Sequence, residues 1–150
     1  MWLIAPSLLA APFDVYMVRH FEKQKGDDPQ LTAEGRQRAE GLANLLKDKG
    51  LSKIYSTNYR RTLQTALPLS EKTNTAVTHY NPGDLEAFVI QLKEAKEDVL
   101  VVGHSNTTPV LFGLLGGATF TMTEADYGEL FKVTIDDKKV TTSSRMVSPE

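Results

Sequence analysis

The chain of 150 residues contains no cysteine, so disulfide bonds and thiolate chemistry are excluded. Because a protein without cysteine tolerates reducing and oxidising surroundings alike, this absence leaves the compartment open. The histidine spacing typical of zinc sites, His-x-x-x-His, is also missing. We therefore expect neither a metal ion nor another cofactor.

A strong excess of one charge is missing as well. Lysine and arginine supply 17 positive charges, and aspartate and glutamate supply 19 negative ones, which leaves a net charge of −2. Since proteins that bind nucleic acid usually carry a basic surface, this balance argues against nucleic acid as a dominant partner. Any binding of an anion must depend on a few locally placed side chains.

The sequence also lacks an apolar run long enough to span a membrane. Its apolar start, residues 1–11, is much shorter than the ~20 residues that a transmembrane helix needs, and we expect no stable membrane insertion. The segment has no basic region typical of a complete signal peptide. We interpret it as the trailing part of an export signal, which would make the protein exported or periplasmic. The alternative is an N-terminal arm of an otherwise cytoplasmic protein.

Residues 12–150 alternate between strand-like and helix-like segments, as in a single α/β domain. A chain of this length buries roughly two-thirds of its unfolded surface, enough for three layers. Apolar strands are predicted near Val15, Ile54, Ala76 and Val99, and helices over residues 32–49, after Arg60, and over residues 85–96 and 109–115.

The last part of this domain has a different pattern. Residues 130–135 alternate in period two, turn at residues 136–139 and return through residues 140–142, which predicts a hairpin at a sheet edge. The expected fold is a three-layer α/β/α sandwich with a mostly parallel central sheet and a C-terminal edge hairpin.

Residues with useful chemistry stand where the predicted strands end. The apolar run at Val15–Val18 stops at Arg19 and His20, and residues beyond the carboxyl ends of strands line the ligand crevice in open α/β sheets. An arginine offers a planar fork of donors to phosphate oxygens, and a neutral imidazole can act as a nucleophile. A single pair of this kind is weak evidence.

The same pattern occurs a second time. A second apolar strand, residues 98–102, is followed by Gly103 and His104, so two of the three histidines occupy equivalent strand ends. A helix follows, with Thr108 predicted as its N-cap and Pro109 at its first helical position. This recurrence favours a functional role for both histidines over a structural one.

A pair of arginines lies between the two histidines. The short strand at Ile54 leads into a helix that carries Arg60 and Arg61 in its first turn. The N-terminus of a helix already favours negative charge because of its unpaired N–H groups and its dipole. An arginine placed there indicates an anion site.

Four motifs, taken together and in this order, resemble those of the histidine phosphatase superfamily, in its phosphoglycerate-mutase-like branch. They are Val18–Lys23 with the Arg-His pair, Asp28–Gly35 with a Leu-Thr-x-x-Gly step, Ser56–Ala66 with the second arginine, and Gly103–Thr107 with the second histidine. The resemblance covers most of the chain. Its register selects Arg61 as the arginine that binds phosphate.

The resemblance implies a metal-independent phosphatase that works in two steps. His20 attacks phosphorus to form a phosphohistidine, and water then releases phosphate. Arg19, Arg61 and His104 hold the three equatorial oxygens, whose charge has to be neutralised during phosphoryl transfer. The expected partner is a phosphorylated small molecule or a phosphoprotein.

The motifs do not identify the proton donor for the leaving group. Many family members place an aspartate directly after the second histidine, where this chain has Ser105 and Asn106. These two residues either bind the phosphoryl oxygens or are ordinary turn residues before a helix. The candidate acids are Glu22, close to the nucleophile in sequence, and Asp84, after a Pro-Gly turn. Alternatively, Glu22 forms an ion pair with Lys23, Lys25 or an arginine of the phosphate site, and Asp84 caps the helix over residues 85–96.

Two other functions stay open. A phosphoglycerate mutase-type phosphotransferase must keep its intermediate away from water, whereas the short segments between the motifs leave no long insertion to cover the site. A phosphatase is therefore preferred. A non-catalytic module that binds a phosphate ligand needs no nucleophile, so the intact His20 argues against it, while the missing acid argues for it.

Overall fold

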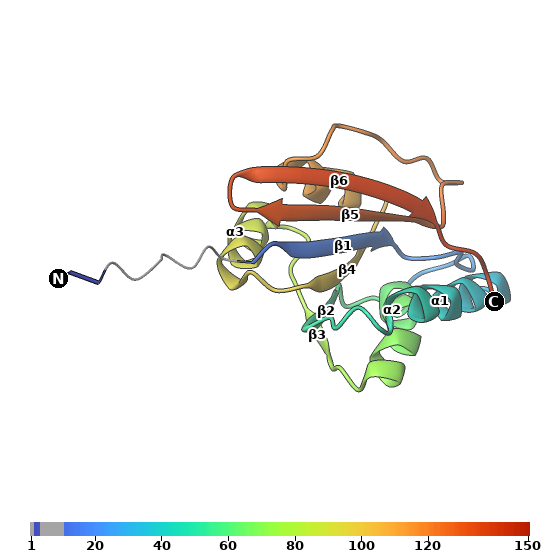
Figure 1. The fold of residues 1–150 in the computed structure, drawn as a ribbon. Coiled ribbons are helices and arrows are strands. Elements are labelled where there is room, and N and C mark those ends of the chain that lie inside the picture. The colour runs from blue at the N-terminus through green and yellow to red at the C-terminus, as the bar shows by residue number, and fades with distance from the viewer. Residues whose placement is uncertain (1, 4–10) are drawn as a thin grey trace.

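The computed structural model describes residues 2–3 and 11–150 (Figure 1). The segment interpreted as an export signal or an arm, residues 1–11, lies almost entirely outside the described residues, and both interpretations stay predictions. Within the described part of the chain, none of the helices combines the length and the apolar character needed to cross a bilayer.

The centre of the described fold is a six-stranded sheet with the order β3-β2-β4-β1-β5-β6 (Figure 1). Its strands are β1 (Phe13–Arg19), β2 (Lys53–Ser56), β3 (Val77–His79), β4 (Val99–Gly103), β5 (Glu129–Asp136) and β6 (Lys139–Met146). Strands β1 to β4 are parallel, β5 is antiparallel to β1, and β6 pairs with β5 in a hairpin. The mostly parallel sheet and the C-terminal edge hairpin are therefore confirmed.

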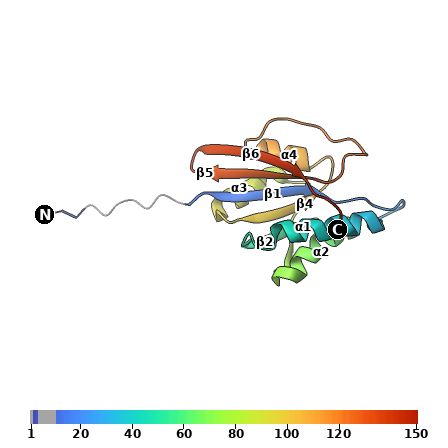
Figure 2. The ribbon, with the colours of Figure 1, turned by 45° about the vertical axis from the view of Figure 1, so that its right-hand side comes forward.

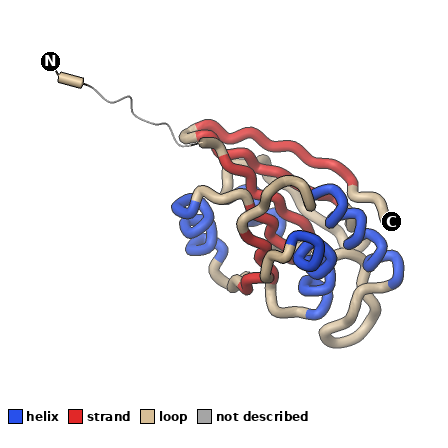
Figure 3. The backbone as a smooth tube through the Cα atoms, turned by 60° about the horizontal axis from the view of Figure 1, so that its bottom comes forward, coloured by secondary structure: helices blue, strands red, loops and turns tan. Residues whose placement is uncertain are grey.

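In residues 11–150, four helices cover the two faces of the sheet. They are α1 (Ala33–Leu46), α2 (Arg60–Thr73), α3 (Leu85–Ala95) and α4 (Thr108–Leu114). Helices α1 and α2 pack on one face, and α3 and α4 pack on the other (Figure 2 and Figure 3). This arrangement confirms the predicted three layers.

The side chains of β1 alternate between two buried layers because helices cover both faces of the strand. Val15 and Met17 pack with α3 and α4, whereas Tyr16 and Val18 pack with α1 and α2. Parallel strands that are buried on both faces have continuous apolar sequences, unlike half-exposed strands. Strand β4 is built in the same way, and so both strands that precede the histidine motifs are conspicuous in the sequence.

Threonine residues mark two helix starts, one of which differs from the prediction. Thr32 caps α1, because its Oγ1 accepts a hydrogen bond of 3.1 Å from the N–H of Gly35. The prediction of Thr108 as N-cap of α4 is wrong by one position, since Thr107 is the N-cap and Thr108 is already helical. The reason is that the Thr108 N–H bonds back to the His104 carbonyl at 2.9 Å, which closes a helical turn.

The sheet brings together the segments that follow β1, β2 and β4. Arg19 at the end of β1 pairs in register with Gly103 at the end of β4, and β2 ends one pair earlier, at Ser56. Because these neighbouring strands are parallel, the chain leaves all three at the same edge. The Arg-His pair, the arginine motif and the second histidine therefore meet there.

Candidate active site

A pocket of about 440 Å³ opens where β1, β2 and β4 end. The four residues predicted as catalytic line it, and so do the two predicted to bind substrate: Arg19, His20, Arg61, His104, Ser105 and Asn106. The rings of the two histidines lie 5.7 Å apart, measured between their centroids. The structure thus brings together residues from three separate segments of the chain.

His20 is buried, and its ring is neutral. Its Nδ1 lies 2.8 Å from the carbonyl oxygen of Phe21, and only a protonated Nδ1 can donate to that carbonyl. In the neutral ring, Nε2 therefore carries the lone pair that a nucleophile requires. Burial, followed by the positive charges of Arg19 and Arg61, lowers the pKa of His20 to about 3. The imidazole is thus held in the form that can attack phosphorus.

The guanidinium of Arg19 is held by the chain on one side. Its Nη1 donates to the carbonyl oxygens of Thr123 and Asp126 at 3.0 and 2.8 Å, and its carbon lies 4.0 Å from the centre of the Tyr127 ring. Its Nε is buried and has no hydrogen-bond partner among the described residues. Because an unpaired buried donor is costly, the site favours a ligand that accepts a hydrogen bond there.

Arg61 lies in the first turn of α2, as predicted. Its Nε is also buried without a hydrogen-bond partner in the described residues, and its guanidinium carbon lies 4.7 Å from the centre of the Tyr59 ring. A residue far from α2 in sequence provides a hydrogen bond at the start of this helix, since Asp28 Oδ1 accepts a hydrogen bond of 2.9 Å from the Arg60 N–H. Arg60 is exposed and does not line the pocket.

His104 is oriented by a buried pair of threonines. Its Nε2 lies 2.8 Å from Thr57 Oγ1, which in turn lies 3.0 Å from Thr62 Oγ1. Burial, followed by the charges of Arg61 and Arg19, lowers the pKa of His104 to about 4. Sequence reasoning did not assign a role to Thr57. The available signal was a small hydroxyl residue placed directly after a buried strand, inside the arginine motif.

Glu22, the first candidate acid, is directed to α1 and not to the pocket. Its carboxylate accepts hydrogen bonds from Nε and Nη2 of Arg38 at 3.0 and 2.9 Å. Burial opposes ionisation of Glu22, but these hydrogen bonds and the charge of Arg38 outweigh it, so the pKa is lowered. A carboxylate in this ion pair is a poor proton donor. The ion pair predicted as the alternative for Glu22 is thus present, but its partner is Arg38 of α1 and not Lys23, Lys25 or an arginine of the phosphate site.

Asp84, the second candidate, lies at the start of α3. Its side chain accepts a hydrogen bond of 3.2 Å from the Ala87 N–H and so caps the helix. The preceding residues Pro82 and Gly83 line the pocket, but Asp84 does not. The arrangement agrees with its interpretation as an N-cap.

Among the lining residues that sequence reasoning missed, three have side chains that are charged or aromatic. They are Lys23, Tyr59 and Glu124, and Glu124 supplies the sole carboxylate of the described lining. Lys23 is adjacent to the Arg-His motif, whereas Glu124 lies in a segment without a recognisable motif or periodicity. In the described part of the chain, no cluster of three or more His, Asp or Glu residues is arranged to hold a metal ion.

Comparison with known proteins supports the resemblance. The family model described as histidine phosphatase superfamily (branch 1) matches residues 15–82. The curated protein 6-phosphofructo-2-kinase/fructose-2,6-bisphosphatase 1 of Rattus norvegicus is 36% identical over 63 residues, which cover 37% of this chain and 13% of that protein. The chain therefore corresponds to only a small part of that relative.

Solved structures are similar over nearly the whole chain. The protein histidine phosphatase SixA, in complex with tungstate, has a TM-score of 0.71 and 21% identity, covering 91% of this chain and 97% of that one. The alpha-ribazole phosphatase of Shigella flexneri has a TM-score of 0.72 and 17% identity, covering 91% and 96%. Phosphoserine phosphatase of Entamoeba histolytica has a TM-score of 0.70 and 14% identity, covering 92% and 98%. These likenesses show the fold, and with the family match they confirm the predicted resemblance.

Proposed function

We propose that this member of the histidine phosphatase superfamily is a metal-independent phosphatase, which hydrolyses phosphate monoesters or other phosphorylated substrates through a phosphohistidine at His20. The single observation that carries the proposal is the pair of buried Nε donors of Arg19 and Arg61, which have no partner among the described residues, beside a neutral His20. Two arginines that keep donors for a ligand favour a tetrahedral oxyanion such as a phosphoryl group.

In the first step, Nε2 of His20 attacks phosphorus, and the bond from phosphorus to the leaving oxygen breaks. The hydrogen bond from Nδ1 to the Phe21 carbonyl keeps the lone pair on Nε2 and stabilises the positive charge that the ring acquires. Charge on the equatorial oxygens is neutralised by Arg19 and Arg61, as electrostatic catalysis of phosphoryl transfer requires, and His104, whose lowered pKa keeps its ring neutral, contributes a hydrogen bond and not a charge.

In the second step, water attacks the phosphohistidine, and the bond from phosphorus to Nε2 breaks. The electron pair of that bond returns to Nε2, so His20 is neutral again and inorganic phosphate leaves. Burial favours this neutral form of His20 in the free site. Thr57 keeps the ring of His104 in place through its hydrogen bond of 2.8 Å during both steps.

The proposal covers a class of substrates and does not identify one compound. The similar solved structures include phosphatases described as acting on phosphoserine, on alpha-ribazole phosphate and on phosphohistidine in proteins. A phosphorylated small molecule and a phosphoprotein are both consistent with a pocket of about 440 Å³. A broad screen of phosphorylated compounds, with release of inorganic phosphate as readout, would narrow this range.

The central test uses His20→Ala and, as control, replacement of the exposed third histidine, His79→Ala. With p-nitrophenyl phosphate as substrate, His20→Ala should lose at least about 10⁴-fold in kcat, which is typical for removal of a nucleophile. His79→Ala should keep the wild-type rate. The wild type should also form an acid-labile, base-stable phosphoenzyme that His20→Ala does not form.

Three results would contradict the proposal. The first is activity of His20→Ala near that of the wild type. The second is complete loss of wild-type activity in a chelator with recovery on addition of magnesium. The third is tight binding of phosphate or vanadate by the wild type without turnover of any substrate, which would favour a binding module.

A further inference from the structure

The segment between α4 and β5, residues 115–128, contributes a carboxylate to the phosphate pocket. We call this segment the α4–β5 loop. Its Glu124 lines the pocket together with the two arginines and the two histidines, and no other carboxylate of the described residues does so. The side chain is exposed, in contrast to His20. An exposed carboxylate at the rim of a cationic pocket can reach the part of a substrate that is not held by the arginines.

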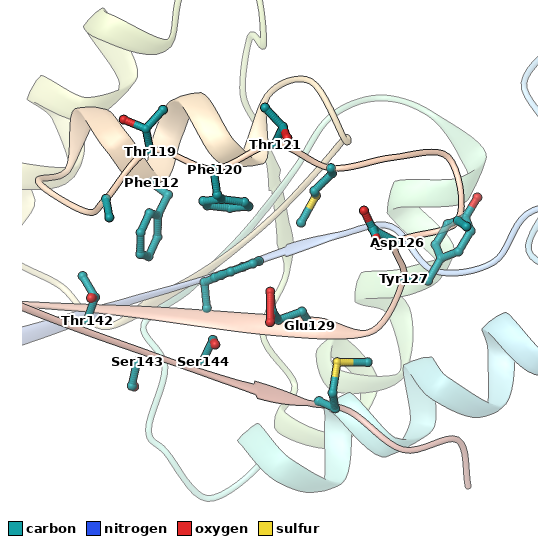
Figure 4. Close-up of a pocket in the computed structure, with 15 residues that line it drawn as sticks. Phe112, Thr119, Phe120, Thr121, Asp126, Tyr127, Glu129, Thr142, Ser143 and Ser144 are labelled. Atoms are coloured by element: carbon teal, nitrogen blue, oxygen red, sulfur yellow. The ribbon is translucent and has the colours of Figure 1, made fainter.

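The first half of the α4–β5 loop is fixed by aromatic packing. The ring of Phe120 stacks on Phe131 of β5 with a centroid distance of 4.7 Å and lies edge-on to Phe112 of α4 at 5.3 Å. Figure 4 shows Phe120 directed from the loop toward the β5-β6 hairpin. Aromatic pairs at these distances stabilise beyond what area burial alone contributes. The loop therefore has a defined place above the sheet.

The second half of the loop is fixed by Arg19 itself. Nη1 of Arg19 donates to the carbonyl oxygens of Thr123 and Asp126, which lie on both sides of Glu124 in sequence. The Asp126 carboxylate closes this turn by accepting a hydrogen bond of 2.6 Å from the Thr123 N–H. The arginine that keeps its Nε for the phosphoryl group thus also holds the backbone on either side of Glu124.

We propose that Glu124 is the proton donor for the leaving group, an inference that rests on the proposed phosphatase function. In the first step, the Glu124 carboxyl gives its proton to the leaving oxygen as the P–O bond breaks and the bond from His20 Nε2 to phosphorus forms. In the second step, the Glu124 carboxylate takes a proton from the attacking water as the P–N bond breaks. The products are an alcohol and inorganic phosphate, and both side chains return to their starting states.

The other carboxylates near the pocket are less suited to this role. Glu22 is held by Arg38 in an ion pair of 2.9 Å that lowers its pKa, and Asp84 is engaged as the cap of α3. Both residues have a structural partner, and neither lines the pocket. For Glu124, no hydrogen bond or ion pair of the side chain is present among the described residues.

The test compares two substrates whose leaving groups differ in their need for a proton. An alkoxide such as that of glycerol 2-phosphate leaves poorly without protonation, whereas the nitrophenolate of p-nitrophenyl phosphate leaves unaided. Glu124→Gln should therefore lower kcat/KM for glycerol 2-phosphate by about 10²- to 10⁴-fold, the usual contribution of a general acid. For p-nitrophenyl phosphate the loss should be less than about 10-fold.

The matched control is Glu129→Gln. Glu129 lies at the start of β5 and lines a neighbouring cavity between the loop and the hairpin, not the phosphate pocket (Figure 4). Glu129→Gln should leave the ratio of kcat/KM for the two substrates unchanged. Glu22→Gln and Asp84→Asn are measured in the same way.

Each outcome decides on the role of Glu124. Selective loss on the alkyl phosphate in Glu124→Gln alone supports it. The role is overturned if Glu124→Gln loses equally on both substrates or loses nothing, or if the selective loss appears in Glu22→Gln or Asp84→Asn. In each of these cases, turnover that depends on His20 still supports the phosphatase function. A wild type that hydrolyses p-nitrophenyl phosphate but no alkyl phosphate overturns the role of Glu124 too, and the absence of any His20-dependent turnover overturns both proposals.

Discussion

The two sides of the phosphate pocket are built in different ways. On one side, His20 and His104 directly follow parallel strands whose register is set by the sheet. On the other side, Glu124 and Tyr127 lie in the α4–β5 loop, which contains neither helix nor strand. Backbone hydrogen bonds of the sheet place the first side. The second is placed by contacts with Arg19 and by the packing of Phe120 on two phenylalanines outside the loop.

This difference has a consequence for how each side responds to substitution. The histidines keep their backbone positions whatever happens in the pocket, because the strands are buried on both faces. The loop and Arg19 depend on each other, since the guanidinium holds the carbonyls of Thr123 and Asp126 and these carbonyls orient the guanidinium. With p-nitrophenyl phosphate, whose leaving group needs no proton, we therefore expect the largest losses on the sheet and helix side, and smaller, graded losses on the loop side.

The sharpest test of the first side is the pair Arg61 and Arg60. Successive residues of a helix point about 100° apart, so both side chains cannot face one phosphate group equally. Arg61→Ala should lower the single-turnover rate with p-nitrophenyl phosphate by about 10²- to 10³-fold, the usual cost of losing one preorganised donor. The exposed Arg60→Ala should lose far less. The reverse ranking would show that the motif register is wrong.

The loop side is tested by Tyr127, whose ring lies 4.0 Å from the Arg19 guanidinium carbon. A cation–π contact that is partly shielded from water contributes about 1–2 kcal/mol. Tyr127→Leu should therefore lower kcat/KM by about 10-fold. Tyr127→Phe keeps the ring and loses only the contact of the hydroxyl with Nη2 at 3.4 Å, so it should stay close to the wild type. Equal losses in both variants would show that the hydroxyl, not the ring, orients Arg19.

The side that rests on the sheet was predictable from the sequence. Apolar runs buried on both faces can be recognised without a structure, and the residue that follows such a run has to lie at the carboxyl end of its strand. The places of Arg19, His20 and His104 follow directly, and the helix after β2 does the same for Arg61. The pocket contains all four, although their roles in catalysis are still proposals.

The directions of single side chains were not predictable in this way. Glu22 is only two residues from His20, yet the chain has left the sheet there and the carboxylate turns to Arg38 of α1. Closeness in sequence says little about direction outside a regular element. The loop that carries Glu124 has no periodicity, and its contacts with Arg19 and Phe131 join segments far apart in the chain. These contacts depend on the tertiary fold and leave no local signal.

A third prediction concerns the buried hydroxyl behind His104. Thr57→Val keeps the shape of the side chain but removes the hydrogen bond of 2.8 Å to Nε2. Since a hydrogen bond of this kind contributes about 0.5–1.5 kcal/mol, kcat should fall by about 5-fold. Thr57→Ser restores the hydroxyl and should recover most of the rate. A wild-type rate for Thr57→Val would show that packing alone orients His104.

The last prediction concerns stability and not activity, and it comes from the two buried histidines. Burial lowers the pKa of His20 from 6.5 to about 3 and that of His104 to about 4, so below pH 6.5 the unfolded chain binds protons that the folded chain does not. The free energy of unfolding therefore decreases as the pH falls below 6.5, by at most about 1.4 kcal/mol per pH unit for each histidine. Above pH 6.5 the two histidines no longer make the free energy of unfolding depend on pH. In urea titrations between pH 6.5 and about 4.5, His20→Asn should show a shallower decrease than the wild type, whereas the exposed His79→Asn should keep the wild-type slope. Identical slopes for His20→Asn and the wild type would contradict a His20 that is buried in its neutral form.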